Sequence, residues 1–224
     1  MGRLAPRAER VQFRGRHAGE TVYVLASGAS LNHIDPGFFA GKTVVAVNFI
    51  GAELGLTDYY MCSHYHLDAI AVTAKHPGQT IIVPEVDQGG TQLAPYAPPG
   101  DNVWAFPTNQ QAYAAFDPDV HWPADPDSLV VGPTSLHFTM HFAHYLGAAH
   151  IVLVGADCGT LDGQENRSGH DRGIGSPWEV WARSLPRVAD RLRAMGSNVY
   201  SLNPFVNFGI EGHSYWSPTA VVNP

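Results

Sequence analysis

The sequence has few charged residues and no long apolar run. Only 15% of its 224 residues are charged, and 20 acidic against 13 basic side chains give a net charge of -7 with histidine neutral. An acidic chain is poorly suited to neutralise many phosphates, so we expect no sequence-independent binding of nucleic acid. No stretch stays apolar over the length that a membrane-spanning helix needs, so we expect no membrane span.

Cysteine is also scarce, with Cys62 and Cys158 far apart in the sequence. Two such thiols do not make a disulfide framework, which indicates a reducing compartment. Residues 1–16 carry several arginines but no apolar core, so we expect no secretory signal and a cytoplasmic location. The sequence contains no internal repeat and no low-complexity tract.

Hydrophobic residues make up 45% of the chain, enough to bury a large core in one domain. We expect a polar, flexible arm over residues 1–19 and a single nucleotide-binding α/β domain over residues 20–224. Short apolar runs rich in β-branched residues predict strands that are buried on both faces. These runs are Thr21–Ala26, Thr43–Val47, Tyr59–Ser63, Ile81–Pro84, Ile151–Val154 and Asn198–Leu202.

Helices are predicted over Thr134–Leu146 and over Pro177–Met195, the second interrupted by Pro186. Strands that alternate with helices predict parallel βαβ units. The fold class is therefore α/β, with a Rossmann-like, mostly parallel sheet and helices on both faces. Residues 86–130 are rich in Gly, Pro, Asp and aromatic residues, which predicts a loop-rich lid over a site.

Polar residues follow four of the predicted strands. The carboxyl ends of parallel strands line the region where open α/β sheets bind ligands. Small residues after the first strand would let main-chain N–H groups face a phosphate or a sugar-nucleotide. Each position can also be explained as turn chemistry, because glycine, asparagine and aspartate favour turns. The residues concerned are Ser27-Gly28-Ala29-Ser30, Asn48, Ser63, His64, Asp157 and Cys158.

Two segments resemble a known family. The segment VYVLASGASLNHID resembles the first strand and turn of bacterial sialyltransferases of glycosyltransferase family 42 and of the related 6-hydroxymethylpterin diphosphokinase-like domains. Gly132–Asp157 is similar to their second signature, a Gly/Thr/Ser turn, a helix ending in Leu-Gly and a strand ending in Gly-x-Asp. The resemblance implies a sialyltransferase-like variant of the GT-A fold.

The resemblance also implies an activity. The chain would be a glycosyltransferase that moves a sugar from a nucleotide-activated, CMP-sugar-like donor to an acceptor hydroxyl, with no cofactor required. His170, in the loop after Asp157, would be the general base, since an imidazole titrates near neutral pH. The acceptor is left open, and a homo-oligomer is possible because oligomers are common in that family.

Donor contacts follow from the same resemblance. Gly28 and Ser30 would approach the donor phosphate or sugar, and Asn48 would hydrogen-bond the nucleotide part. Asp157 would bind ribose or position a neighbouring loop. Thr134 and Ser135 would contact the other end of the donor.

One part of the family pattern differs here. Where those sialyltransferases place tyrosines that bind the departing phosphate, this chain has Cys158-Gly159-Thr160. His64, Tyr65 and Arg167 could take that role.

Two other functions fit the same predicted fold. A Mg²⁺-dependent diphosphokinase would need carboxylates for the metal, and Asp157, Asp162 and Asp171 are available. A non-catalytic nucleotide-binding module would keep the fold without the chemistry.

Histidine is conspicuous, with 12 residues. His137, His141 and His144 would share one face of a helix at a spacing that can bind a metal. We favour a solvated face instead, with Leu136, Met140, Ala143 and Leu146 packed on the sheet. His64 and His66 would point to the same side of an extended segment and are better ligand candidates.

The aromatic tail Asn203–Pro224 is open to two explanations. It could be an aromatic flap over the acceptor, or a segment packed on the core or on another subunit.

Overall fold

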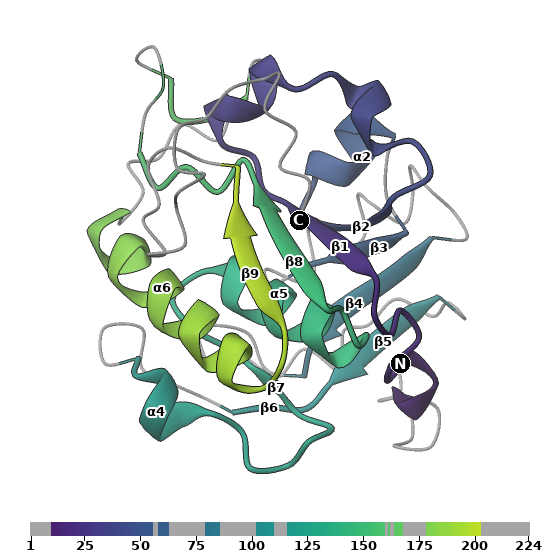
Figure 1. The fold of residues 1–224 in the computed structure, drawn as a ribbon, viewed down its shortest axis with the longest axis vertical. Helices are drawn as coiled ribbons and strands as arrows, with labels where there is room; N and C mark the ends of the chain where they lie inside the picture. Colours follow the sequence, from purple (N-terminus) through teal and green to yellow (C-terminus); the bar gives the residue numbers. More distant parts are fainter. Residues whose placement is uncertain are drawn as a thin grey trace.

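The chain forms a parallel sheet of seven strands in the order β5-β4-β3-β2-β1-β8-β9 (Figure 1). The computed structural model describes residues 10–55, 58–62, 79–85, 102–109, 116–159, 161, 164–167 and 178–202. The strands of this sheet are β1 (Thr21–Leu25), β2 (Thr43–Val47), β3 (Tyr59–Met61), β4 (Thr80–Pro84), β5 (Val103–Phe106), β8 (His150–Val154) and β9 (Asn198–Ser201). All neighbouring pairs are parallel, which confirms the Rossmann-like α/β class.

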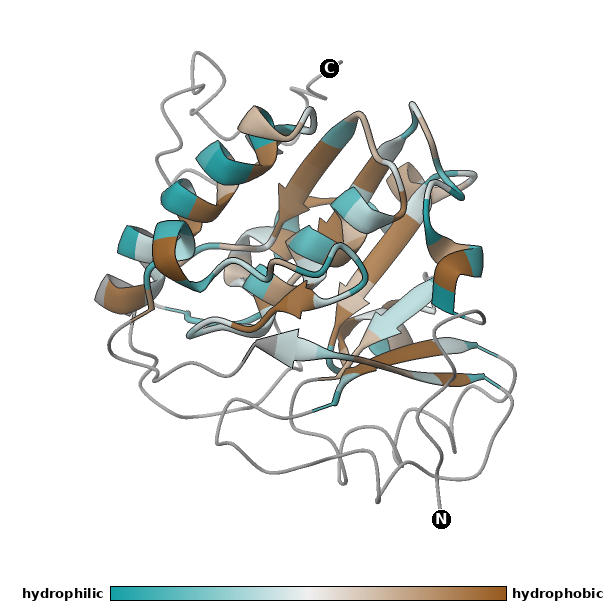
Figure 2. Cartoon of the chain, turned by 90° about the horizontal axis from the view of Figure 1, so that it is seen from below, coloured by the Kyte–Doolittle hydropathy of each residue, from teal (hydrophilic) through white to brown (hydrophobic). Residues whose placement is uncertain are grey.

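Helices cover both faces of the sheet, as predicted. Alternate residues of β1 point to opposite faces, so Val22 and Val24 lie in one core cluster and Tyr23 and Leu25 in another. The first face is covered by α5 (Ser135–Tyr145) and α6 (Trp178–Ala194). The opposite face is covered by η2 (Ala29–His33), η3 (Pro36–Phe39) and α2 (Ile50–Leu54). Beyond their first residue, β1, β2 and β8 are therefore apolar and buried. Figure 2 shows several strands of the sheet as brown arrows.

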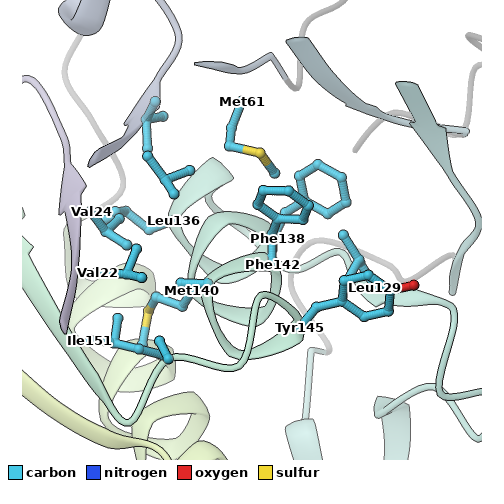
Figure 3. Close-up of a cluster of buried hydrophobic side chains, with 14 of the residues drawn as sticks. Val22, Val24, Met61, Leu129, Leu136, Phe138, Met140, Phe142, Tyr145 and Ile151 are labelled. Carbon is cyan, nitrogen blue, oxygen red and sulfur yellow. The ribbon is translucent and has the colours of Figure 1, made fainter. Parts of the chain in front are cut away.

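The centre of the core lies between α5 and the sheet. Figure 3 shows side chains of this helix directed at residues of β1, β3 and β8. The labelled members are Val22, Val24, Met61, Leu129, Leu136, Phe138, Met140, Phe142, Tyr145 and Ile151.

Helix α6 runs through Pro186, although the sequence predicted an interruption there. Proline lacks the N–H that would bond to the preceding turn, so the helix loses one hydrogen bond at this point. The helix is stabilised instead by burial of its apolar side. Leu185, Val188 and Leu192 are fully buried in the core cluster that also contains Val22 and Val24.

The predicted lid over 86–130 is wrong for part of its length. Val103–Phe106 is the edge strand β5 of the sheet, paired with β4. Further along, β6 (Thr108–Asn109) pairs in parallel with β7 (Leu129–Val130), and α4 (Pro118–His121) lies between them in the chain. A short strand between Pro-rich flanks carries little periodicity, so its pairing could not be read from composition. Residues 86–101 and 110–115 lie outside the described residues.

The prediction of a flexible arm over residues 1–19 is wrong for residues 10–19. The 3-10 helix η1 (Val11–Phe13) places the Phe13 ring, 2% exposed, against the rings of Trp104 and Phe142 at centroid distances of 5.2 and 6.1 Å. The main chain then follows the end of α5, where Gly15 N–H donates to Tyr145 O at 3.0 Å. Arg10 and Phe13 are thus buried and the main chain of residues 15–19 is bonded to the fold, although most side chains of this segment are exposed. Residues 1–9 lie outside the described residues.

In the part of the chain that the structure describes, no helix combines the length and apolar character needed to cross a membrane.

Phe13 supplies the test of this packing. We expect Phe13→Ala to lower the free energy of unfolding by about 3–5 kcal/mol, because it leaves a cavity among aromatic rings. Urea denaturation followed by tryptophan fluorescence measures the change. Val11→Ala is the matched control, since Val11 is 43% exposed on the same 3-10 helix and should cost less than about 0.5 kcal/mol. An unchanged unfolding midpoint for Phe13→Ala would contradict the packing of residues 10–19.

Candidate functional site

The strand order reverses direction at β1. The chain leaves β1 through β2 to β5 on one side and returns to β8 and β9 on the other side. Open α/β sheets bind their ligands at the carboxyl ends of the strands beside such a switch point. The segment after β1 and the segment after β8 are therefore the first place to look for a site.

These two segments continue the strand pairing past the ends of the strands. Ala26 N–H donates to Val154 O at 2.8 Å, and Gly28 N–H donates to Gly155 O, also at 2.8 Å. No side chain fits at Gly28, because a Cβ there would overlap Gly155 O and lie 2.5 Å from Asp157 Cγ. Position 28 thus requires glycine, because the segment after β8 passes close to the main chain there. This agrees with the tight turn that the sequence predicted.

Asp157 joins the two segments through its side chain. Its Oδ2 accepts from Ser30 N–H at 2.7 Å, and its Oδ1 accepts from the Ser30 hydroxyl at 2.5 Å. Both residues are buried, with 3% and 1% of their surfaces exposed. Burial raises the pKa of Asp157, while the two hydrogen bonds from Ser30 act in the opposite direction. Asp157 is placed to fix the turn after β1.

This arrangement limits what the turn can offer to a ligand. The sequence predicted that N–H groups of Ser27–Ser30 would face a phosphate. The structure directs the N–H groups of Gly28 and Ser30 to Gly155 and Asp157. Ala29 is buried at the start of η2, and the Leu31 N–H donates to Gly28 O. The N–H groups of Gly28 and Ser30 are thus occupied within the chain and do not face a ligand.

The loop that follows β8 folds back over the same turn. Asn166 forms an isolated antiparallel bridge with Gly28, and Arg167 N–H donates to Ser27 O at 2.8 Å. The Ser27 hydroxyl also donates to Asn166 Oδ1 at 3.2 Å. Sequence reasoning missed the position of Asn166 because no local pattern marks a pairing between residues 139 positions apart.

Asn48 lies at the adjacent strand end. In the parallel register, Leu25 of β1 pairs with Ala46 of β2, so Ser27 and Asn48 each lie two residues beyond a paired position. Asn48 has a positive φ of 55°, a conformation that asparagine tolerates better than most residues. Its N–H donates to Met61 O at 2.8 Å. Its side-chain Oδ1 is buried and has no hydrogen-bond partner among the described residues. Such an unpaired buried acceptor is rare and calls for an explanation.

Thr134 and Ser135 begin α5 at the same edge of the sheet. The Thr134 hydroxyl accepts from Leu136 N–H at 3.2 Å, and the His137 ring accepts from Thr134 N–H, which completes a capping box. The Thr134 side chain thus serves the helix. Ser135 is half-buried in the first turn, where a helix end favours an anion.

The solvated histidine face predicted on α5 is wrong. His137 and His141 are buried, because the β7 segment and Trp122 cover this side of the helix. His141 Nδ1 accepts from Val130 N–H at 2.9 Å, and His144 Nδ1 contacts the Ser197 hydroxyl at 2.8 Å. Each ring therefore has a structural role between α5 and a neighbouring segment. No group of three or more potential ligands within the described residues could hold a metal ion.

Cys158 follows Asp157 in a left-handed conformation with φ of 48°. Burial, followed by the nearby charge of Asp157, raises the pKa of its thiol to about 12. The thiol stays protonated at neutral pH, which rules it out as a nucleophile in this environment.

Several predicted site residues lie outside the described residues. They are Ser63, His64, Tyr65, His66, Asp162, His170, Asp171 and the tail Asn203–Pro224. Of the remaining candidates, the structure brings Ser27, Gly28, Ser30, Asp157 and the start of the Cys158 segment together at the switch point, with Asn48 one strand away.

The Asp157–Ser30 contact gives a stability prediction. Asp157→Ala should lower the free energy of unfolding by about 3 kcal/mol, because it leaves the buried Ser30 N–H without an acceptor. Ser30→Ala removes only the hydroxyl bond and should cost about 1 kcal/mol. Asp119→Ala is the control, since Asp119 pairs with Arg187 on the surface and should change stability by less than about 0.5 kcal/mol. Urea denaturation at pH 7.5 measures the stability of all three variants. Equal unfolding midpoints for Asp157→Ala and the wild type would contradict a stabilising role for the Asp157–Ser30 contact.

The buried histidines give a pH prediction. Burial lowers the pKa of both His137 and His141 from 6.5 to about 3. Below pH 6.5 the unfolded chain therefore takes up protons that the folded chain does not, and stability falls as the pH falls. At pH 5 the loss should be about 2 kcal/mol for each ring relative to pH 7.5.

The measurement is urea denaturation at pH 7.5, 6.0 and 5.0. His141→Asn keeps an acceptor for Val130 N–H without the titrating ring, so its stability should fall less steeply with pH than that of the wild type. Parallel pH profiles for the two proteins would contradict the neutral, buried state of His141.

A comparison with protein-family models finds no match to this chain, and a search of curated proteins finds none.

Proposed function

We propose that the chain binds a nucleotide-activated sugar at the carboxyl ends of β1 and β2 and transfers the sugar to an acceptor hydroxyl. Two features support the proposal. The strand order reverses at β1, where α/β sheets place their ligands. The buried Oδ1 of Asn48, at the end of the neighbouring strand, has no partner among the described residues.

The unpaired side-chain oxygen of Asn48 is the main support for a ligand at this edge. A carbonyl-type oxygen accepts hydrogen bonds, so its missing partner should be a donor. Ribose hydroxyls and the amino groups of nucleobases are donors of this kind. The left-handed backbone and the bond from Asn48 N–H to Met61 O hold the residue in place without help from its side chain. Its amide is thus left to bind the nucleotide part of the donor.

The occupied N–H groups in the turn after β1 favour a sugar donor with one phosphate. A diphosphate is usually held by several converging main-chain N–H groups or by a metal ion. Here the N–H groups of Gly28 and Ser30 are occupied by Gly155 and Asp157. A sugar linked to a nucleoside monophosphate, such as a CMP-sugar, places less negative charge at this edge and needs fewer donors.

The proposed reaction is a substitution at the anomeric carbon. The acceptor oxygen forms a bond to that carbon, and the bond from the carbon to the phosphate oxygen breaks. The phosphate leaves with the electron pair, and the acceptor proton passes to a general base. We assign that base to His170, which lies outside the described residues, because an imidazole is suited to proton transfer near neutral pH.

The magnesium-dependent alternative gains no support at Asp157. Both carboxylate oxygens of this residue accept hydrogen bonds from Ser30, so Asp157 fits a metal poorly while the turn is closed. Asp162 and Asp171, the other carboxylates considered, lie outside the described residues.

The test uses the full chain with CMP-, UDP-, GDP- and ADP-sugars. Isothermal titration should detect binding of one donor class, and release of the free nucleotide should follow when an acceptor is supplied. Asn48→Ala should weaken nucleotide binding roughly 10-fold, the effect of one hydrogen bond. Asn32→Ala is the matched control, because Asn32 is exposed and bonds Gln164.

His170→Ala separates chemistry from binding. It should lower the transfer rate by at least about 100-fold and leave the nucleotide affinity unchanged. Wild-type turnover in this variant would refute the role of His170, whereas failure of the wild-type chain to bind any of the nucleotides would refute the proposed function.

A further inference from the structure

Residues 116–131, which contain α4 and β7, cover one side of α5. This cover segment is outside the seven-stranded sheet, because β7 pairs with β6 in a separate sheet of two strands (Figure 1). Its aromatic rings lie against two histidines of the helix. The Trp122 ring is 4.4 Å from the ring of His141, and the Phe116 ring is 5.1 Å from the ring of His137, between centroids. The cover segment thus separates both imidazoles from water.

The hydrogen bonds of both imidazoles require them to be neutral. Nδ1 of His141 accepts from Val130 N–H at 2.9 Å, and Nδ1 of His137 accepts from Thr134 N–H at 3.2 Å. A protonated imidazole carries N–H groups at both nitrogens and has no acceptor left. Protonation would therefore set a donor against a donor at each ring. At His141 the opposing donor, Val130 N–H, belongs to the cover segment.

The closed arrangement already leaves one buried donor unpaired. Because Nδ1 of His137 accepts a hydrogen bond, its proton is on Nε2. His137 is 0% exposed, and this Nε2–H has no hydrogen-bond partner among the described residues. An unpaired buried donor costs free energy that contact with water would recover. Removal of the cover segment would thus satisfy this donor in addition to hydrating the two rings.

No opposite charge is placed to compensate a proton on either ring. Neither His137 nor His141 forms an ion pair with the described residues, and the ring of His144 stacks on that of His141 at 6.1 Å. The carboxylates of the cover segment pair with arginines or with the main chain of the segment itself. The titratable and charged groups of the surrounding elements are His144 of α5, Arg187 and Arg191 of α6, Arg14 before β1, and Asp117, Asp119, His121, Asp125 and Asp127 of the cover segment.

We propose that the cover segment is an acid-sensitive device, which opens as a unit when His137 and His141 take up protons, while the seven-stranded sheet stays folded. The strands β1, β2 and β8 are held by parallel pairing and by apolar side chains, which do not change charge. The cover segment is bonded to α5 through the titrating ring of His141. This inference does not depend on the proposed function.

The direction of the pH effect follows from burial. Burial lowers the pKa of both rings from 6.5 to about 3 while the cover segment is closed. An imidazole in water keeps a pKa of about 6.5. Well above pH 6.5 both states are neutral, and pH has little effect. Between pH 6.5 and 3 only the open state takes up protons, so opening becomes easier as the pH falls. Between pH 7.5 and 5.0 the opening constant should rise about 30-fold for each exposed ring.

Hydrogen–deuterium exchange with mass spectrometry on the full chain locates the opening. Exchange is measured at pH 7.5, 6.0 and 5.0 and corrected for the pH dependence of intrinsic amide exchange. Peptides from residues 116–131 should lose about 30- to 1000-fold of their protection between pH 7.5 and 5.0, for one or two exposed rings. Peptides from β1 and β8 should lose far less, because the sheet stays closed. The wild-type profile decides the matter without relying on the stability of any variant.

Histidine variants assign the effect to the two rings. His141→Asn keeps an acceptor for Val130 N–H without a titrating ring, and should reduce the pH-dependent loss of protection by about 30-fold. His137→Asn should act in the same way, and the double variant should show little pH dependence in residues 116–131. His33→Asn is the matched control. His33 ends η2 on the opposite face of the sheet, so this variant should keep the wild-type profile.

Three results would overturn the proposal. An equal loss of protection in residues 116–131 and in β1 and β8 would show that the whole chain opens together. Unchanged protection of residues 116–131 at pH 5.0 would show that the cover segment does not respond to acid. A wild-type pH profile in the double variant would show that groups other than His137 and His141 control the opening.

Discussion

The contact between Asp157 and Ser30 determines how the carboxyl edge of the sheet is built. A buried carboxylate is costly unless its oxygens are hydrogen-bonded, and here both accept from a single residue of the turn after β1. The contact fixes the path of the chain after β8 against the path after β1. The returning loop then pairs with Ser27 and Gly28, which sets the position of Arg167. The Asp157–Ser30 contact thus positions side chains that could bind a ligand, while Asp157 and Ser30 bond to each other.

Much of the fold could be predicted because its central strands are buried on both faces. In Thr43–Val47 the last four residues are all apolar, a pattern that a strand exposed on one side would not show. The start of α5 was equally readable, since Thr134 is a typical cap. Phe13 and the buried histidines were misjudged for the opposite reason. Their burial depends on partners far away in sequence, namely Trp104, Trp122 and the β7 segment, which no local pattern reveals.

The candidate site was predictable in outline and not in detail. Strand ends identified Asn48, Gly28, Ser30 and Asp157, because carboxyl ends of parallel strands meet at one edge. The sequence could not show that Asp157 faces Ser30 instead of a ligand. Hydrogen bonds between residues 127 positions apart depend on the pairing of β1 with β8, and that pairing is decided by the whole sheet. The same limit applies to Arg167, which has no motif of its own and acquires a position only when Asn166 pairs with Gly28.

Net charge and local charge lead to different expectations for this protein. A net charge of -7 argues against a surface that attracts long polyanions. It does not argue against one phosphate at one place, because an interaction at close range depends on the groups within a few ångströms. The charge state of a group at the strand ends therefore has to be judged from its immediate neighbours, as that of Asp157 is from burial and from the two hydrogen bonds of Ser30.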